Sequence, residues 1–559
     1  MLIWSSQKRP SIIAAYRSPR NGRHPPARSS PYHRFTLNLL RALSTVSGMT
    51  LLSRITGLAR ESLKAAAFGA GMQMDAFEAA FRLPNILRRL FAEGAFSQAF
   101  VPIFAEYRRH RGDDETRALV TRVGTLLAIS LLLLTLIGVL AAPWLVYALA
   151  TGFDKTPGKV ELTAQMIRIV FPYLFFVSLV SLSGGVLNVY RRFAIPAVTP
   201  VLLNVSIIVA ALFLAPYCDP PITALAWGVF VGGAAQLALQ IRPLVKIGML
   251  DWPRLDWRDP GVRRVLIAMG PAVIGVSAAQ ISALINTQLA ASLGDGRISW
   301  ITYADRLMEF PNALLGVALG TVLLPSLAKL HAEARHDEYT SLLDWGLRLA
   351  FLLALPAAVA LWILAIPLIS TLYQYGRFSL EDVLQTRTAL LGYSVGLPGL
   401  IVVKILAPGF YARQVMSTPV KIAFSTVLVT QTLALILMQQ IGHAGLTLAT
   451  SIGACFNASL LFWFLKTRGI YTPAPGWLPF LSKVVIALFV LAAVLLWLGG
   501  PASFWTAASL WQKVGRLCGV CAAGAVAYFA ALWLLGFRLR DFNRRDVTAD
   551  APPAAEADS

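Results

Sequence analysis

The stretch VGTLLAISLLLLTLIGVLAAPWLVYAL, residues 123–149, contains no charged side chain. A helix needs about 20 predominantly apolar residues to cross a lipid bilayer, and this stretch exceeds that length. The whole chain has a similar character, since 57% of its 559 residues are hydrophobic and only 14% are charged. Soluble domains carry about 25% charged residues. The composition therefore predicts an all-α protein with many membrane spans.

Fourteen such segments are predicted to be membrane-spanning helices, and several are long enough to tilt or to extend beyond the lipid. An even number of spans places both termini on the same side. The predicted spans lie near residues 39–68, 75–107, 118–150, 161–190, 196–217, 221–245, 262–293, 297–329, 342–373, 383–412, 418–440, 444–466, 478–499 and 513–537.

Lysine and arginine in the short connections indicate the orientation, because these residues collect on the cytoplasmic side of a membrane. Connections such as PYCDPP (216–221), QQIGHAG (439–445) and GGPASF (499–504) are almost free of them. Both termini are therefore predicted to be cytoplasmic. The alternate connections hold the cations Arg108, Arg109, Arg111, Arg191, Arg192, Lys246, Arg254, Arg258, Lys329, Arg335, Arg413, Lys466, Arg468, Arg538 and Arg540.

The formal net charge of +21 follows largely from this topology and favours contact with anionic lipid head groups. The basic residues are scattered over separate loops without a nucleic-acid-binding motif, which excludes nucleic acid as the expected partner. Residues 1–36 form a basic segment and residues 541–559 a polar one, and both are predicted to be disordered. Cys518 and Cys521 form a C-x-x-C inside an apolar span, where helix packing is a better interpretation than redox or metal chemistry.

The chain contains an internal repeat. FRLPN (81–85) is echoed by MEFPN (308–312), and the two Pro-Asn pairs are 227 residues apart. A second echo relates FPYLFF (171–176) to LPGLIV (397–402) at nearly the same interval. A period that contains six spans predicts two parallel six-helix lobes, with a transport site at their interface. The lobes are predicted at 37–250 and 251–470, and two further helices at 471–540.

Arginine inside these spans requires an explanation, because each central arginine costs roughly 2.5–3.5 kcal/mol on insertion scales. Such residues normally face a protein interior or a watery cavity. Guanidinium groups bind phosphate oxygens in bidentate geometry, so a cavity lined by Arg54, Arg60, Arg88 and Arg306 is predicted to hold a phosphate or diphosphate. Arg88 and Arg89 point about 100° apart on a helix, so only one of them is expected to face the cavity and the other to pair or snorkel.

Further charged residues are candidates, and Arg89 and Glu93 are secondary ones. Asp75 lies at the outer end of the second span, and Glu93 follows Arg88 in the stretch RLPNILRRLFAEGAFSQAF (82–100). The other secondary candidates are Asp305, Glu309 and Lys404. A local ion pair between Arg306 and Glu309 is one alternative, and snorkelling of Lys404 to the surface is another. The six histidines form no metal-binding cluster in the sequence, so no metal is predicted.

Four segments resemble a known family, the MviN/MurJ lipid II flippases of bacterial cell-wall synthesis. The resemblance extends from about residue 37 to about residue 545. The segments are SRITGLARE (53–61), DAFEAAFRLPNILRRLFAEGAFSQAFVPIFAEY (75–107), YADRLMEFPNALLGVALGTVLLPSL (303–327) and ILAPGFYARQ (405–414).

The resemblance implies the multidrug/oligosaccharidyl-lipid/polysaccharide exporter fold, with two lobes around a cationic cavity and two extra helices that form a groove for a polyprenyl tail. The family's essential cavity residues match Arg54, Arg60, Asp75, Arg88 and Arg306, with Asp75 expected to pair with a cavity arginine or to assist gating. Relatives begin near the position of Leu37, so residues 1–36 are expected to reflect an upstream start site. Tail peptides in the intact protein would contradict that expectation.

The implied function is movement of lipid II to the periplasmic leaflet of the inner membrane by alternating access, with cell-wall synthesis and division proteins as possible partners. The chain lacks the G-x-x-x-x-G-K-[ST] phosphate loop. We therefore expect no ATP hydrolysis by this chain, and an ion gradient or the membrane potential is expected to drive transport. Neither an enzymatic activity nor a cofactor is predicted. The alternatives are export of another polyprenyl-linked saccharide or of drugs, and a scaffold role in wall synthesis. An enzyme acting on polyprenyl phosphates would require more clustered acids.

Overall fold

The computed structural model describes residues 31–90 and 96–538; within these ranges, the side chains of 31–47, 274–276, 317–318 and 321–322 are not described. Across the described residues the chain forms helices and turns and no strand, which confirms the all-α prediction. Helix α1 (Pro31–Phe68) begins before residue 37, so the end of the predicted disordered extension is helical. The candidate Glu93 and the predicted C-terminal tail lie outside the described residues.

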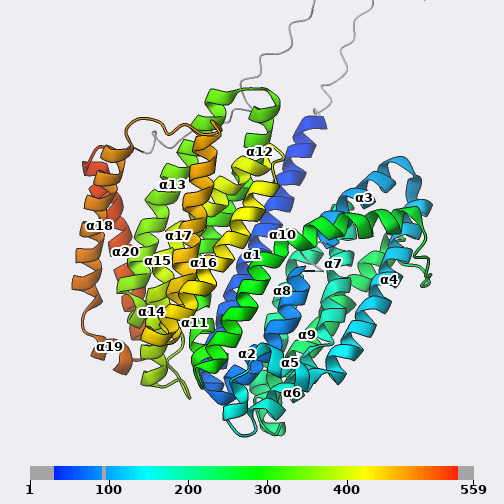
Figure 1. Cartoon of the computed structure of the whole chain (residues 1–559), viewed down its shortest axis with the longest axis horizontal. Coiled ribbons are helices and arrows are strands. Elements are labelled where there is room, and N and C mark those ends of the chain that lie inside the picture. Colours follow the sequence, from blue (N-terminus) through cyan, green and yellow to red (C-terminus); the bar gives the residue numbers. More distant parts are fainter. Residues whose placement is uncertain (1–30, 91–95, 539–559) are drawn as a thin grey trace, which may run out of the picture.

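Two groups of helices lean apart from each other, as Figure 1 shows. The first group is the N-lobe: α2 (Met72–Leu87), α3 (Ser97–His110), α4 (Gly112–Leu140), α5 (Ala142–Leu149), α6 (Lys159–Val170), α7 (Tyr173–Val189), α8 (Ala194–Val209) and α9 (Thr223–Lys246). The second is the C-lobe: α11 (Arg297–Pro311), α12 (Ala318–Ala332), α13 (His336–Ile363), α14 (Ala365–Leu372), α15 (Leu380–Tyr411), α16 (Ser417–Ile441) and α17 (His443–Thr467).

The final helices α18 (Trp477–Gly499), α19 (Ala502–Ala507) and α20 (Leu510–Leu534) lie at the outer edge of the C-lobe (Figure 1). Buried side chains of α18 and α20, such as Val484 and Tyr528, form one core cluster with Leu352 of α13. Phe489 and Trp497 on α18 are 72% and 82% exposed. Such large apolar side chains on an outer surface are expected where a helix faces lipid.

Two helices connect the lobes. Helix α1 packs against α8 and runs between the lobes in Figure 1. Helix α10 (Pro260–Ser292) is bent by 55° between Val273 and Ser277. Its first part packs on α3 of the N-lobe and its remainder packs on α16 of the C-lobe, so the predicted lobe boundary near residue 251 precedes a helix that belongs to both lobes.

Ten helices in the described residues are long and apolar enough to cross a membrane, and the bent α10 makes eleven. The three remaining predicted spans, 39–68, 75–107 and 297–329, correspond to α1, to α2 with α3, and to α11 with α12. These three contain the arginines that the sequence singles out, which lower their hydropathy. The count of fourteen therefore stays a prediction.

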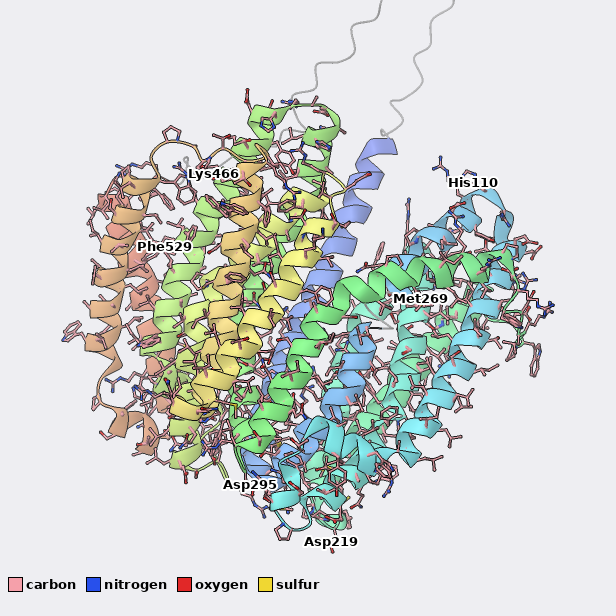
Figure 2. The ribbon with its side chains drawn as sticks, in the orientation of Figure 1. His110, Asp219, Met269, Asp295, Lys466 and Phe529 are labelled. Atoms are coloured by element: carbon pink, nitrogen blue, oxygen red, sulfur yellow. The ribbon has the colours of Figure 1, made fainter. Side chains whose placement is uncertain are left out.

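The loops collect at two opposite ends of the molecule. One end, here called the basic end, holds the connections at His110 and Lys466 (Figure 2). The opposite end, here called the far end, holds Asp219 and Asp295 (Figure 2).

Prolines and π-helical turns interrupt helices in both lobes. Pro172 separates α6 from α7, and Pro311 ends α11 just before the π-helical turn η5 (Asn312–Val317). In the N-lobe the helix also widens into a π-helical turn at residues 88–90, after Pro84 and Asn85. The two Pro-Asn pairs therefore occupy matching places in the two lobes.

Candidate functional site

A cavity of about 1050 Å³ lies between the two lobes. Five arginines of the described chain line it: Arg60, Arg82, Arg88, Arg89 and Arg306. Three carboxylates also line it: Glu78, Asp305 and Glu309. The lining side chains therefore carry a surplus of two positive charges. A site with this surplus is suited to a doubly charged anion, because buried charges require compensation.

Glu61 connects the arginines of the two lobes. Its carboxylate is 2% exposed and forms a close ion pair with Arg60 on the same helix. Arg306 on α11 places its Nε 3.8 Å from Glu61 Oε1. Arg60 also donates from Nη1 to Asn204 Oδ1 on α8, at 2.8 Å. Arg60 of α1 and Arg306 of the C-lobe are thus held at the same oxygen of Glu61, and both line the cavity.

A second buried cation lies behind Glu61. Lys64 donates from Nζ to Glu61 Oε2 at 2.9 Å and to Glu78 Oε1 at 2.5 Å. Lys64 and Glu78 are only 4% and 8% exposed. The ion pairs therefore run from α2 through α1 to α11, and they fix the rotamer of Glu61.

Replacing Lys64 alone with methionine is expected to destabilise the protein by about 3–5 kcal/mol, because two buried carboxylates lose their shared cation. The double variant Lys64→Met/Glu78→Met removes a whole ion pair and is expected to recover part of that loss. Thermal unfolding of the detergent-purified variants measures both effects. A single variant as stable as the wild type would contradict the network.

The second helix supplies three arginines to the cavity wall. Arg82 donates from Nε to Thr287 Oγ1 on α10 at 2.9 Å. Arg88 donates from Nε to Asn85 Oδ1 at 3.3 Å. The prediction that only one of Arg88 and Arg89 faces the cavity is wrong, because both line it. The π-helical turn at 88–90 changes the 100° spacing on which that prediction relied.

The other predicted residues divide into two groups. Asp305 and Glu309 line the cavity, and Glu309 accepts from Asn312 Nδ2 at 3.4 Å in place of the considered pair with Arg306. Arg54 has an exposed side chain and is not among the lining residues. Lys404 is also absent from the lining and donates from Nζ to the carbonyl oxygen of Asn312 at 3.2 Å.

Asp75 lies at the far end instead of in the cavity wall, and its side chain is fully buried. It accepts from Lys159 Nζ at 3.2 Å on α6. From the C-lobe it accepts the backbone N–H of Gly296 at 2.7 Å, and the N–H and hydroxyl of Ser299 at 2.9 and 2.7 Å. Lys159 also pairs with Asp295 of the C-lobe at 2.6 Å. We call Asp75, Lys159, Asp295 and Ser299 the far-end latch.

Backbone contacts reinforce this latch. Arg377 N–H of the C-lobe donates to the carbonyl oxygen of Ala66 on α1 at 2.8 Å. Tyr303 hydroxyl donates to the carbonyl oxygen of Gly69 at 3.3 Å. A Cβ atom at Gly152 would lie 2.5 Å from the carbonyl oxygen of Ala291, so the chain approaches closely there only because glycine has no side chain. The two lobes are thus joined at the far end of the cavity.

Sequence reasoning did not identify Glu61, Lys64, Glu78 or Lys159. Charged residues inside apolar spans are a signal for such sites. Glu61, Lys64 and Glu78 carry this signal, because they lie in the same two predicted spans as Arg60 and Arg88. The partner of Asp75 is different, because Lys159 is 84 residues away and lies at the start of α6, where a lysine is unremarkable. The described residues contain no group of three or more His, Cys, Asp or Glu side chains that could hold a metal ion.

Comparison with known proteins places these residues in context. A family model described as "Lipid II flippase MurJ" matches residues 64–514. A Burkholderia cenocepacia protein named "Lipid II flippase MurJ" is 51% identical over 515 residues, which cover 91% of this chain and 100% of that protein. A Vibrio cholerae protein named "Probable lipid II flippase MurJ" is 40% identical over 512 residues, covering 90% and 98% of the two chains.

Solved structures show the same fold. A structure titled "Lipid II flippase MurJ, inward closed conformation" aligns with a TM-score of 0.75 and 23% identity, over 89% of this chain and 99% of that one. An inward-facing multidrug resistance MATE family transporter of the MOP superfamily aligns with a TM-score of 0.63 and 15% identity, over 76% and 98% of the chains.

Proposed function

The chain belongs to the MurJ family of lipid II flippases, and from this membership we propose that it moves lipid II from the cytoplasmic to the periplasmic leaflet of the bacterial inner membrane. The observation that carries the proposal is the cationic cavity between the lobes. A lipid with a large polar head group needs a polar path across the bilayer, and this cavity supplies one while the tail stays in lipid.

The diphosphate of lipid II is the part of the head group that the arginines would hold. A diphosphate diester carries two negative charges, which equals the surplus of two positive charges on the cavity wall. Arg60 comes from α1, which packs on α8 of the N-lobe, Arg306 comes from the C-lobe, and Arg88 also lines the cavity. Planar guanidinium groups suit phosphate oxygens better than a lysine ammonium would, because they form two parallel hydrogen bonds.

The far-end latch supports an alternating-access cycle. The latch closes the cavity at the far end, so the substrate would enter from the basic end or laterally from the adjoining leaflet. Breaking the latch and rocking the lobes would then expose the cavity at the far end. We propose that the apolar groove for the polyprenyl tail is formed by α18 and α20, which stand outside the two lobes.

We propose that the membrane potential or an ion gradient drives the cycle. Moving one elementary charge through the potential supplies about 2.3 kcal/mol per 100 mV. The ion pairs of the cavity are the groups on which such a drive would act, because they lie on the membrane-spanning helices between the two ends.

The proposed orientation places the basic end in the cytoplasm. A membrane-impermeant thiol reagent added outside spheroplasts is therefore expected to label the native Cys218, which lies in the connection between α8 and α9 at the far end. A cysteine in place of the exposed Thr472, at the basic end, is expected to react only after permeabilisation. Each of the two proteins would contain that one cysteine only, with every other cysteine replaced by serine. The reverse labelling pattern would overturn the orientation.

Depletion of the protein in cells tests the function itself. The fraction of lipid II that a periplasmic probe reaches is expected to fall as the protein is lost. An unchanged fraction would indicate that the protein serves wall synthesis in another way, such as a scaffold.

A further inference from the structure

Besides Asn286, which is only partly buried, three amide side chains of the cavity wall have polar atoms without hydrogen-bond partners. Gln236 and Gln240 lie one turn apart on α9, and Asn312 lies in the η5 turn of the opposite lobe. All three line the cavity and are at most 7% exposed. The unpartnered atoms are Gln236 Oε1, both amide atoms of Gln240, and Asn312 Oδ1.

A neighbouring amide shows what full pairing looks like in this wall. Asn204 on α8 accepts from Arg60 and donates from Nδ2 to the carbonyl oxygen of Ser53 and to Thr56 Oγ1, each at 3.1 Å. Gln236 donates from Nε2 to the carbonyl oxygen of Thr199 at 2.7 Å and leaves its own oxygen unpartnered. Gln240 is fully buried and makes no such contact at all. Buried polar groups are normally paired, so this amide requires an explanation.

Binding of a diphosphate by the cavity arginines does not explain the unpaired amides. Guanidinium groups only donate, and a diphosphate only accepts, so the diphosphate would occupy the arginines and leave the amide oxygens unused. A ligand group that satisfies the amides must both donate and accept and must carry no charge. Sugar hydroxyl and acetamido groups meet this requirement.

Position along the helices agrees with this assignment. Helix α8 runs from the basic end toward the far end, and Thr199 precedes Asn204 by five residues, or about 7 Å along the axis. Gln236 is bound to Thr199, whereas Arg60 is bound to Asn204. The amides therefore lie on the basic-end side of Arg60, where a head group anchored by its diphosphate would extend.

We propose that Gln236 and Gln240, with Asn312 across the cavity, form a subsite for the uncharged saccharide part of the transported head group. The subsite rests on the proposed function and adds a specificity element to it. Gln240 has no accessible surface in this structure. When the sugar enters, the amide of Gln240 therefore turns toward the cavity, where its oxygen and nitrogen form hydrogen bonds to the sugar.

The test compares two ligands on one variant. Purified Gln240→Met is expected to bind lipid II about tenfold more weakly than the wild type, the effect of losing two neutral hydrogen bonds. Its affinity for undecaprenyl diphosphate, which has no sugar, is expected to stay within about twofold of the wild type, since no sugar contact is involved. Its thermal unfolding temperature without ligand is expected to equal or exceed that of the wild type, because the substitution removes no bond.

A matched control and a second variant make the result decisive. Gln385→Met removes a partly buried glutamine that does not line the cavity, and it is expected to bind both lipids normally. Gln236→Met is expected to show the same ligand preference as Gln240→Met, even where the lost contact to Thr199 lowers its stability. Equal weakening for both lipids, or no weakening for either, would overturn the subsite.

Two further arms separate the sources of an effect. A disaccharide-bearing lipid without the peptide stem is expected to show the full tenfold loss. A loss confined to the peptide-bearing lipid would overturn the saccharide assignment, because the amides would then bind the stem. A wild-type protein that binds neither lipid would refute the proposed function, whereas normal binding by Gln240→Met would refute the subsite alone.

Discussion

Arg306→Ala is expected to weaken binding of undecaprenyl diphosphate by roughly 30- to 5000-fold, the range for truncating one partner of a desolvated charge pair. Arg306 is the arginine that the C-lobe contributes beside Glu61 at the cavity. Its loss leaves Arg60 to hold the diphosphate from one lobe only, so the ligand no longer links the two lobes. Transport is expected to fail along with binding.

Two comparisons isolate the cavity charge. Arg254→Ala removes a cation whose side chain is 70% exposed in the connection before α10, and it is expected to bind like the wild type. Undecaprenol, which lacks phosphate, is expected to compete poorly with undecaprenyl diphosphate for binding to either protein. An Arg306→Ala protein that keeps wild-type affinity for undecaprenyl diphosphate would show that the diphosphate binds elsewhere.

Asp75→Asn is expected to destabilise the state that is closed at the far end by about 3 kcal/mol. This value is the lower part of the range for breaking a buried ion pair. The lower value applies because Lys159 keeps its contact with Asp295. An asparagine would preserve the shape of Asp75, but its NH₂ group would replace one of the two accepting oxygens. That NH₂ group would face either the donors Gly296 N–H and Lys159 Nζ or the donor Ser299 N–H. The closed state would then lose population to states that are open at the far end.

The reactivity of a buried cysteine measures this opening. Ala291 is 1% exposed and lies against Gly152 at the joined far end. In a background without native cysteines, Ala291→Cys is expected to react with a water-soluble thiol reagent more than about tenfold faster when Asp75→Asn is present. Asp219→Asn, in an exposed far-end loop, serves as the control. Equal reactivity in all three proteins would show that Asp75 does not hold the lobes together.

The fold and much of the site could be predicted from the sequence, because lipid restricts which residues a membrane-spanning helix can contain. Apolar runs predicted the helices, and the repeated Pro-Asn pairs predicted two lobes, in which Pro84 and Pro311 occupy matching places. Charged residues inside spans predicted Arg60, Arg88 and Arg306 at the cavity, since such side chains seldom face lipid.

The remaining features depend on packing between distant segments. Arg54 satisfied the same rule as Arg60, but the side of α1 that faces the cavity was not encoded in spacing along one helix. The latch depends on contacts of Lys159 and Ser299 with Asp75. Ser299 is 224 residues away from Asp75 in the sequence. The cavity role of Arg89 depended on a π-helical turn, which regular helical spacing does not predict.

The most direct test of the central claim follows lipid II in cells depleted of this protein and supplied with wild type, Arg306→Ala or Arg254→Ala, with membrane levels of each protein matched. A periplasmic probe that cannot cross the membrane reports the lipid II that has reached the outer leaflet. The account predicts that wild type and Arg254→Ala restore access of the probe and that Arg306→Ala does not. Restoration of access by Arg306→Ala to the wild-type level would contradict transport through the arginine-lined cavity.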